Sequence, residues 1–76
     1  MNNKRRALLQ KAISTLDTAA DYINTVLDEE QDSLDNMPEN LESSDRYAKM
    51  EAAIDKLEEA IEEIDSAKES LEEASE

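Results

Sequence analysis

The chain of 76 residues contains no cysteine, no histidine and no glycine, and it has one proline and two tyrosines as its only aromatic residues. Without cysteine there are no disulfides, thiolate metal sites or cysteine nucleophiles. Without histidine the commonest zinc ligand and the usual general base are missing too. The absence of glycine excludes a glycine-rich phosphate loop and disfavours tight β-hairpin turns, which need positive φ. The length allows one small domain.

The charge balance is strongly acidic, with 21 Asp and Glu against 8 Lys and Arg and a formal net charge of −13. Such a surface repels nucleic acid and anionic membranes, so we expect neither as a direct partner. Residues 1–6 are basic like the start of a signal peptide, but Lys11 and Asp17 interrupt the apolar segment that should follow. No apolar run approaches the roughly 20 residues of a membrane span. We therefore expect a cytoplasmic protein.

Apolar residues recur at alternating intervals of three and four in both halves of the chain. This period, held over four heptads, is typical of long helices that pack by knobs into holes, whereas strands need alternation at period two. We call these positions the seam, and Glu30 and Lys68 are its two polar members. Its apolar members are Leu9, Ile13, Leu16, Ala20, Ile23, Leu27 and Leu34 in the first half and Tyr47, Met50, Ile54, Leu57, Ile61, Ile64 and Leu71 in the second.

Pro38 separates the two periodic segments, because it removes a hydrogen-bond donor and pushes Met37 out of the helical region. Ser43 or Ser44 can cap the second helix, with Asp45 in its first turn. We predict a single all-α domain, 1–76: a coiled-coil-like antiparallel two-helix hairpin with helices at about 3–34 and 44–75 and a loop at about 35–43. Basic residues 4–6 would then lie beside the acidic end of the second helix, at Glu69, Glu72, Glu73 and Glu76.

Small residues form a column beside the seam in each half. A lone two-helix hairpin of this size buries only a thin core, and small residues let another helix approach closely. We therefore expect a homodimer that forms a four-helix bundle, with a solitary hairpin as the alternative. The columns are Ala12, Ala19 and Val26 in the first half and Ala53, Ala60, Ala67 and Ala74 in the second.

The second half carries most of the negative charge. Residues 35–76 have 15 acids and 4 bases, a net charge of −11, whereas residues 1–34 have 6 acids and 4 bases, a net charge of −2. One interpretation is a surface that binds a basic partner by mimicking DNA; the other is a surface that keeps a small bundle in solution. The candidate partner-binding acids are Glu58, Glu59, Glu62, Glu63, Asp65, Glu69, Glu72 and Glu73.

The loop supplies a second candidate contact site, at Met37, Pro38, Leu41 and Arg46. Its apolar side chains either close the end of the core, the interpretation we favour, or form a hydrophobic knob for a partner.

Residues 28–39 have acids at the first, third, fifth and twelfth places of a calcium-binding loop. The sixth place, which needs glycine for its sharp turn, holds Ser33, so we predict no metal site. No catalytic set is found either, since a serine or threonine nucleophile would lack a suitable base and pocket. We expect a protein that is not an enzyme and has no cofactor.

The loop motif D-N-M-P-E-N-L at residues 35–41, with Ser44, Arg46 and Tyr47 after it, resembles small uncharacterised helical proteins of phages, mobile elements and genomes of gut Gram-positive bacteria. The resemblance covers residues 29–61. It implies an accessory protein of a mobile element that contacts a host or defence protein. Residues 44–60 are also distantly similar to phage sponges for signalling nucleotides, whose cationic pocket only Arg46, Lys49 and Lys56 would supply here.

Three functional hypotheses follow. The first is a non-catalytic acidic module that binds a basic surface of a host regulator, nucleic-acid-binding protein or defence protein, as a DNA-mimic-like inhibitor would. The second is a structural coiled-coil adaptor that acts through its seam and loop. The third is a sponge for a small signalling nucleotide.

Overall fold

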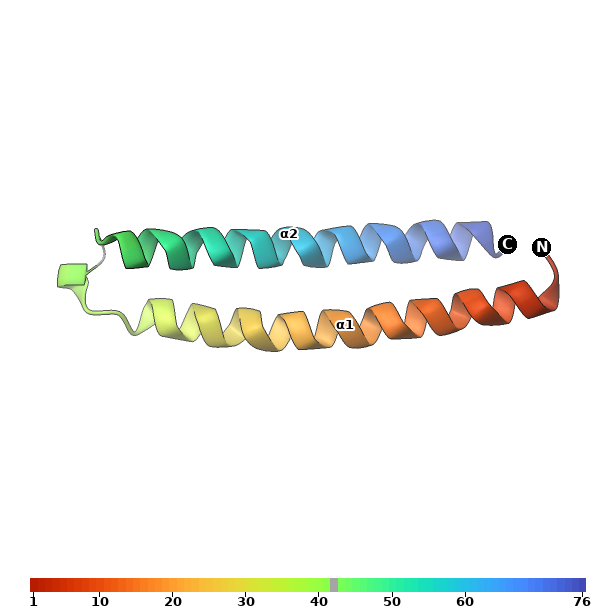
Figure 1. Ribbon diagram of the computed structural model, residues 1–76, viewed down its shortest axis with the longest axis horizontal. Helices are drawn as coiled ribbons and strands as arrows, with labels where there is room; N and C mark the ends of the chain where they lie inside the picture. Colours follow the sequence, from red (N-terminus) through yellow and green to blue (C-terminus); the bar gives the residue numbers. More distant parts are fainter. Residues whose placement is uncertain (42) are drawn as a thin grey trace.

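The computed structural model describes residues 1–41 and 43–76, which form two long helices joined by a short connection. Helix α1 spans Asn3–Asp35 and helix α2 spans Asp45–Ala74, with the 3-10 turn η1 at Glu39–Leu41 between them. The two helices lie side by side and run in opposite directions, so both chain ends lie at one end of the rod and the connection lies at the other (Figure 1). The expected all-α hairpin is confirmed.

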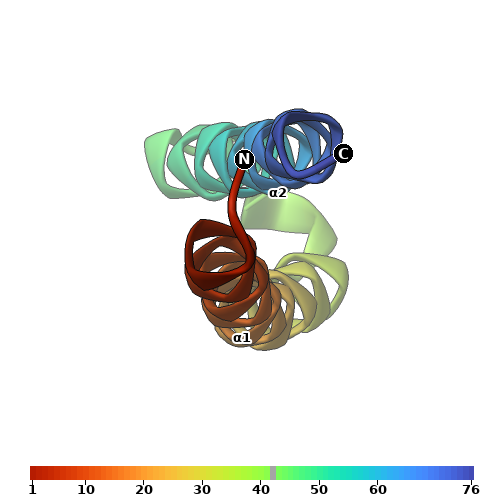
Figure 2. The ribbon, with the colours of Figure 1, turned by 90° about the vertical axis from the view of Figure 1, so that its right-hand side faces the viewer.

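The molecule is a rod of 59 × 15 × 12 Å. Viewed from its end, the described chain is one layer of two helices, with no third element covering either side (Figure 2). Each helix therefore packs on one side only, and the rest of its circumference faces outward.

Both helices begin at a polar capping residue. The side chain of Asn2 accepts a hydrogen bond from the backbone N–H of Arg5 at 2.8 Å, and Ser44 Oγ accepts one from the N–H of Tyr47 at 3.2 Å. These bonds satisfy amide groups that have no partner within the first turn of a helix. Of the two serines left open by the sequence, Ser44 is the cap.

The connection is a short series of turns held by its own backbone. The N–H of Asn36 bonds to the carbonyl of Asp32 at the end of α1, and the N–H of Leu41 bonds to the carbonyl of Pro38 at 2.9 Å. The N–H of Ser44 then donates to the carbonyl of Leu41 at 3.0 Å and brings the chain to the start of α2. Glu42, part of the predicted loop, lies outside the described residues.

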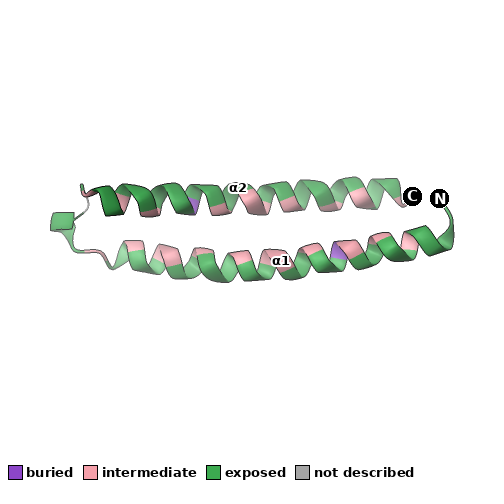
Figure 3. Cartoon of the chain, in the orientation of Figure 1, coloured by how far each residue is buried: buried purple, intermediate pink, exposed green. Residues whose placement is uncertain are grey.

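The core is a single stripe between the helices. Among the described residues only Ile13 and Ile54 are buried, with 8% and 5% of their surface exposed. All the other seam positions are half-buried, Glu30 and Lys68 included, and they follow the facing sides of α1 and α2 (Figure 3). The heptad pattern therefore identified the packing side of both helices.

Candidate functional site

The seam divides the hairpin into two broad faces. Each residue advances a helix by about 100°, so the residue after a seam position lies on one side of the seam and the residue before it lies on the other. Because both helices are right-handed and antiparallel, the residues that follow the seam lie on the same side of the hairpin in α1 and in α2.

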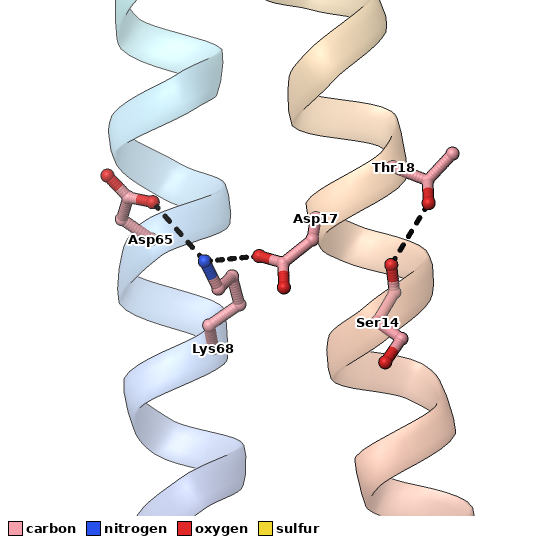
Figure 4. A network of polar contacts seen from close by, with 5 residues as sticks. All are labelled: Ser14, Asp17, Thr18, Asp65 and Lys68. Atoms are coloured by element: carbon pink, nitrogen blue, oxygen red, sulfur yellow. Dashed lines mark hydrogen bonds and ion pairs between the residues drawn. The ribbon is translucent and has the colours of Figure 1, made fainter.

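A contact between the helices fixes this assignment. Asp17 follows the seam in α1, and Asp65 follows it in α2. Both carboxylates reach the same ammonium group, that of Lys68, with Asp65 at 4.0 Å (Figure 4). Asp17 and Asp65 therefore lie on one side of the seam.

This side of the hairpin carries acids and no bases. The spacing of the seam extends to two further half-buried residues, Arg6 in α1 and Ser75 just after α2. We call the acids that follow a seam position, Ser75 included, the acidic face. All twelve are exposed, and none of the seam-following positions in either helix holds Lys or Arg. They are Asp17, Asp21, Asp28, Asp35, Glu51, Asp55, Glu58, Glu62, Asp65, Glu69, Glu72 and Glu76.

Lys68 is the cation at the edge of the acidic face. Its side chain is 26% exposed and spans the seam from α2 to Asp17 on α1. The hydrogen bond to Asp17 raises the pKa of Lys68 above its ordinary value; burial opposes the rise, and the charges of Asp17, Asp65 and Glu72 add to it. The ammonium is therefore charged at neutral pH and joins the two helices.

The opposite side, made by residues that precede the seam, has a different composition. We call it the apolar face. It carries four bases and two acids among apolar and small side chains. Its residues are Arg5, Leu8, Ala12, Thr15, Ala19, Tyr22, Val26, Glu29 and Ser33 on α1 and Arg46, Lys49, Ala53, Lys56, Ala60, Glu63, Ala67, Ser70 and Ala74 on α2. Met1, just before α1, lines a pocket with Arg5 and Leu8 on the same side.

The eight acids predicted as a binding surface are all exposed, but the geometry separates them into three groups. Glu59 and Glu73 are not next to a seam position in the sequence, and they lie on the outer edge of α2, away from α1. Glu63 precedes a seam position and lies on the apolar face. The remaining five belong to the acidic face: Glu58, Glu62, Asp65, Glu69 and Glu72. The acids of α1 on this face, from Asp17 to Asp35, were not predicted as part of the binding surface. That prediction followed the number of acids per stretch of sequence and not their direction around the helix.

The four predicted loop-contact residues lie at the end of the rod away from the chain ends. Met37 is half-buried, which suits an apolar side chain at the end of the core. Leu41 is 43% exposed, and Pro38 and Arg46 are exposed as well. Half-buried Met37 therefore fits the interpretation that the loop closes the end of the core, and exposed Leu41 fits the interpretation that it forms a contact for a partner.

Arg6 makes a contact that the sequence analysis did not identify. Residues 4–6 were expected to lie beside the acidic end of the second helix, and Arg6 donates there from Nε to the main-chain carbonyl of Ser75 at 2.9 Å and from Nη2 to that of Glu76 at 3.3 Å. A cation from the start of α1 thus satisfies carbonyl groups at the end of α2, where the helix dipole is negative. Arg6 therefore lies beside the end of the second helix, as the basic N-terminal segment predicted, and the groups it bonds there belong to the main chain.

The cations that a nucleotide sponge would use all precede the seam and lie on the apolar face of α2. Arg46, Lys49 and Lys56 are exposed, and Lys56 already pairs with Glu59 at 3.1 Å. An open pocket of about 260 Å³ lies at the other end of the rod and is lined by Met1, Arg5, Leu8 and Leu9.

The segment with calcium-loop spacing continues as helix through Asp35. Within residues 1–41 and 43–76, no three acidic side chains are grouped so as to hold a metal ion. Neither described helix is long and apolar enough to cross a membrane.

No known protein family matches the chain, and comparisons with curated proteins and with solved structures also find no match.

Proposed function

We propose that the chain is a non-catalytic interaction module whose acidic face binds a basic surface of a host regulator, nucleic-acid-binding protein or defence protein. In this role its carboxylates take the place of nucleic-acid phosphates, and the module acts in the cytoplasm as an accessory protein of a phage or mobile element. The observation that supports the proposal is the gathering of twelve acids, and no base, on one face of the rod.

The density of these charges is close to that of a nucleic-acid strand. Helix α2 has 30 residues, which at 1.5 Å per residue extend over about 45 Å. Twelve carboxylates along that length average about one every 4 Å, compared with about 3.4 Å per phosphate along one DNA strand. A groove that binds phosphates would meet a similar charge spacing here.

The charge also exceeds what solubility requires. A net charge of about 2–8 in magnitude keeps a small domain dispersed, and this chain carries −13. A surface that serves only solubility has no need to exclude bases from one face while placing four of them on the other.

The test compares two triple charge reversals with the same change in net charge. In the first, Glu58, Glu62 and Glu69 on the acidic face become Lys; in the second, Asp32, Glu59 and Glu73 on the outer edges become Lys. Immobilised wild-type chain is mixed with bacterial lysate, and the bound proteins that added DNA releases are identified. The amount of each of these proteins that binds is then measured with each variant. We expect the acidic-face variant to lose them and the outer-edge variant to retain most of the binding.

Ionic strength supplies the second half of the test. Binding through the acidic face should weaken steeply between 50 and 500 mM salt, because exposed charges are screened over about 8 Å at 0.15 M. Affinity that is unchanged across this series, or equal losses in both variants, would exclude the proposal.

A second candidate function, the structural adaptor, is favoured by the exposure of Leu41 in the connection. In that case Leu41→Asp would abolish binding, while the acidic-face reversal would leave it intact. Met37→Asp is not an equivalent test, because Met37 is half-buried and its replacement also disturbs the end of the core.

A further inference from the structure

Helix α1 carries a second apolar stripe on its outer surface. Leu8, Ala12, Ala19, Tyr22 and Val26 follow the spacing of three and four residues that marks the seam, displaced by one residue, with Thr15 as the polar member of the series. Leu8 is 59% exposed, Tyr22 72% and Val26 47%, so the hairpin covers the larger side chains of the stripe only in part. A helix with two such stripes is suited to pack against two neighbours.

The second stripe is continuous with a column of alanines on α2. Ala53, Ala60, Ala67 and Ala74 each precede a seam position, so they lie on the same side of the hairpin as the stripe of α1. Together they make the apolar face a broad surface of small and apolar side chains, over which another helical layer can approach closely.

The charge distribution selects the occupant. The apolar face has four bases and two acids, whereas the acidic face has twelve acids, so two copies can meet through their apolar faces with both acidic faces turned outward. On each helix the bases lie toward the start, and the acid, Glu29 on α1 or Glu63 on α2, lies further along. When each helix packs antiparallel to the same helix of the second copy, the bases of one copy therefore come near the acid of the other.

The exposed area also matches the need of a dimer. The described chain exposes 5761 Å², about 1,000 Å² more than the roughly 4,700 Å² expected for a folded monomer of 8.6 kDa. A stable interface buries about 800 Å² on each partner. One more copy on the apolar face would remove the excess.

We propose that a second copy of this chain covers the apolar face and that the two hairpins form an antiparallel four-helix bundle. Its two acidic faces then lie on opposite exteriors of the dimer. This inference does not depend on the proposed function, since the interface and the acidic face lie on opposite sides of the rod.

Sedimentation equilibrium with matched double variants tests the interface. Leu8→Glu with Val26→Glu places two charges on the apolar face, and Ser14→Glu with Asn24→Glu places the same two charges on the other side of α1, at exposed positions. At about 50 μM we expect the wild type and the second variant to have twice the mass of 8.6 kDa. We expect the first variant to dissociate at least 100-fold more readily, with unchanged helicity by circular dichroism.

Two results would overturn the inference: a wild type that is monomeric at 50 μM with full helicity, whatever else its apolar face binds, or equal weakening by both variants. If the first variant loses its helical signal, Tyr22→Glu decides, because Tyr22 is mostly exposed in the hairpin. A fully helical monomer of Tyr22→Glu supports the interface, and a fully helical dimer of undiminished affinity refutes it.

Discussion

Lys68 shows how a charge at a packing position can specify structure. Most seam positions hold apolar residues that would tolerate a shift of one helix along the other, but the ammonium of Lys68 meets Asp17 only in one alignment. Polar groups at such positions characteristically set register in coiled coils, at some cost in stability. The ion pair between Lys68 and Asp17 gives Lys68 the geometry for such a role.

The pKa of Lys68 leads to a prediction for alkaline pH. Because the pKa is raised above 10.5 in the folded chain, the folded state holds this proton more tightly than the unfolded state does. The resulting stabilisation is present below about pH 10.5 and is lost as the pH rises through the folded value. Denaturant unfolding should therefore give a constant difference in unfolding free energy between the wild type and Lys68→Met from pH 7 to 9.5. Above pH 11 the unfolding free energy of the wild type should fall relative to that of Lys68→Met. A difference that is flat up to pH 12 would contradict it.

Arg6 gives a second prediction for a single side chain. Two of its hydrogen bonds hold the carbonyls of Ser75 and Glu76, just after α2, so Arg6→Ala should cost about 0.5–1.5 kcal/mol. Amide exchange should become faster at residues 72–76. Arg5→Ala, one position away and with an exposed side chain, is the control and should leave exchange at the end of α2 unchanged.

The helices themselves depend on their caps, and the two neighbouring serines allow a direct comparison. Ser44 Oγ accepts the bond from Tyr47, so Ser44→Ala should lower the unfolding free energy by about 1 kcal/mol. Ser43→Ala, before the cap, should lower it by less than about 0.5 kcal/mol. Thermal and denaturant unfolding of both variants measure the difference; equal losses would show that the cap has no special role.

At the level of the helix, the sequence predicted most of the fold because one periodic pattern determines both helix formation and the packing side. The seam positions of α1 and α2 are those expected, down to the polar exceptions Glu30 and Lys68. The choice between Ser43 and Ser44 was open because either hydroxyl can reach an amide two or three residues on, and only the backbone path through η1 decides between them.

The candidate site was less accessible to sequence reasoning. Glu58 and Glu59 are neighbours in the chain but point about 100° apart around the helix, so a run of acids is divided among several directions. The acidic face also includes residues of α1, such as Asp21, that join it only through the antiparallel pairing. The target of Arg6 depends on which main-chain carbonyls after α2 come within reach of its side chain, and the apolar pattern does not specify this.

For the whole molecule, the distribution of charge predicts an unusual response to salt. Twelve like charges on one face repel one another and destabilise the folded chain at low ionic strength. We expect Tm to rise by several degrees between 10 and 500 mM NaCl, and the acidic-face reversal at Glu58, Glu62 and Glu69 to remove most of this rise. The outer-edge reversal should retain more of it, and a Tm that falls with salt in the wild type would contradict the interpretation.

The position of both chain ends at one end of a 59 Å rod has a mechanical consequence. A force that pulls the first and last residues apart acts across the helix pair rather than along it. It would first break the bonds of Arg6 to Ser75 and Glu76 and then open the seam one layer at a time toward the connection. The hairpin should therefore unzip at low force, whereas the same chain pulled between one end and Leu41 carries the force along a single helix and loads the backbone hydrogen bonds of that helix.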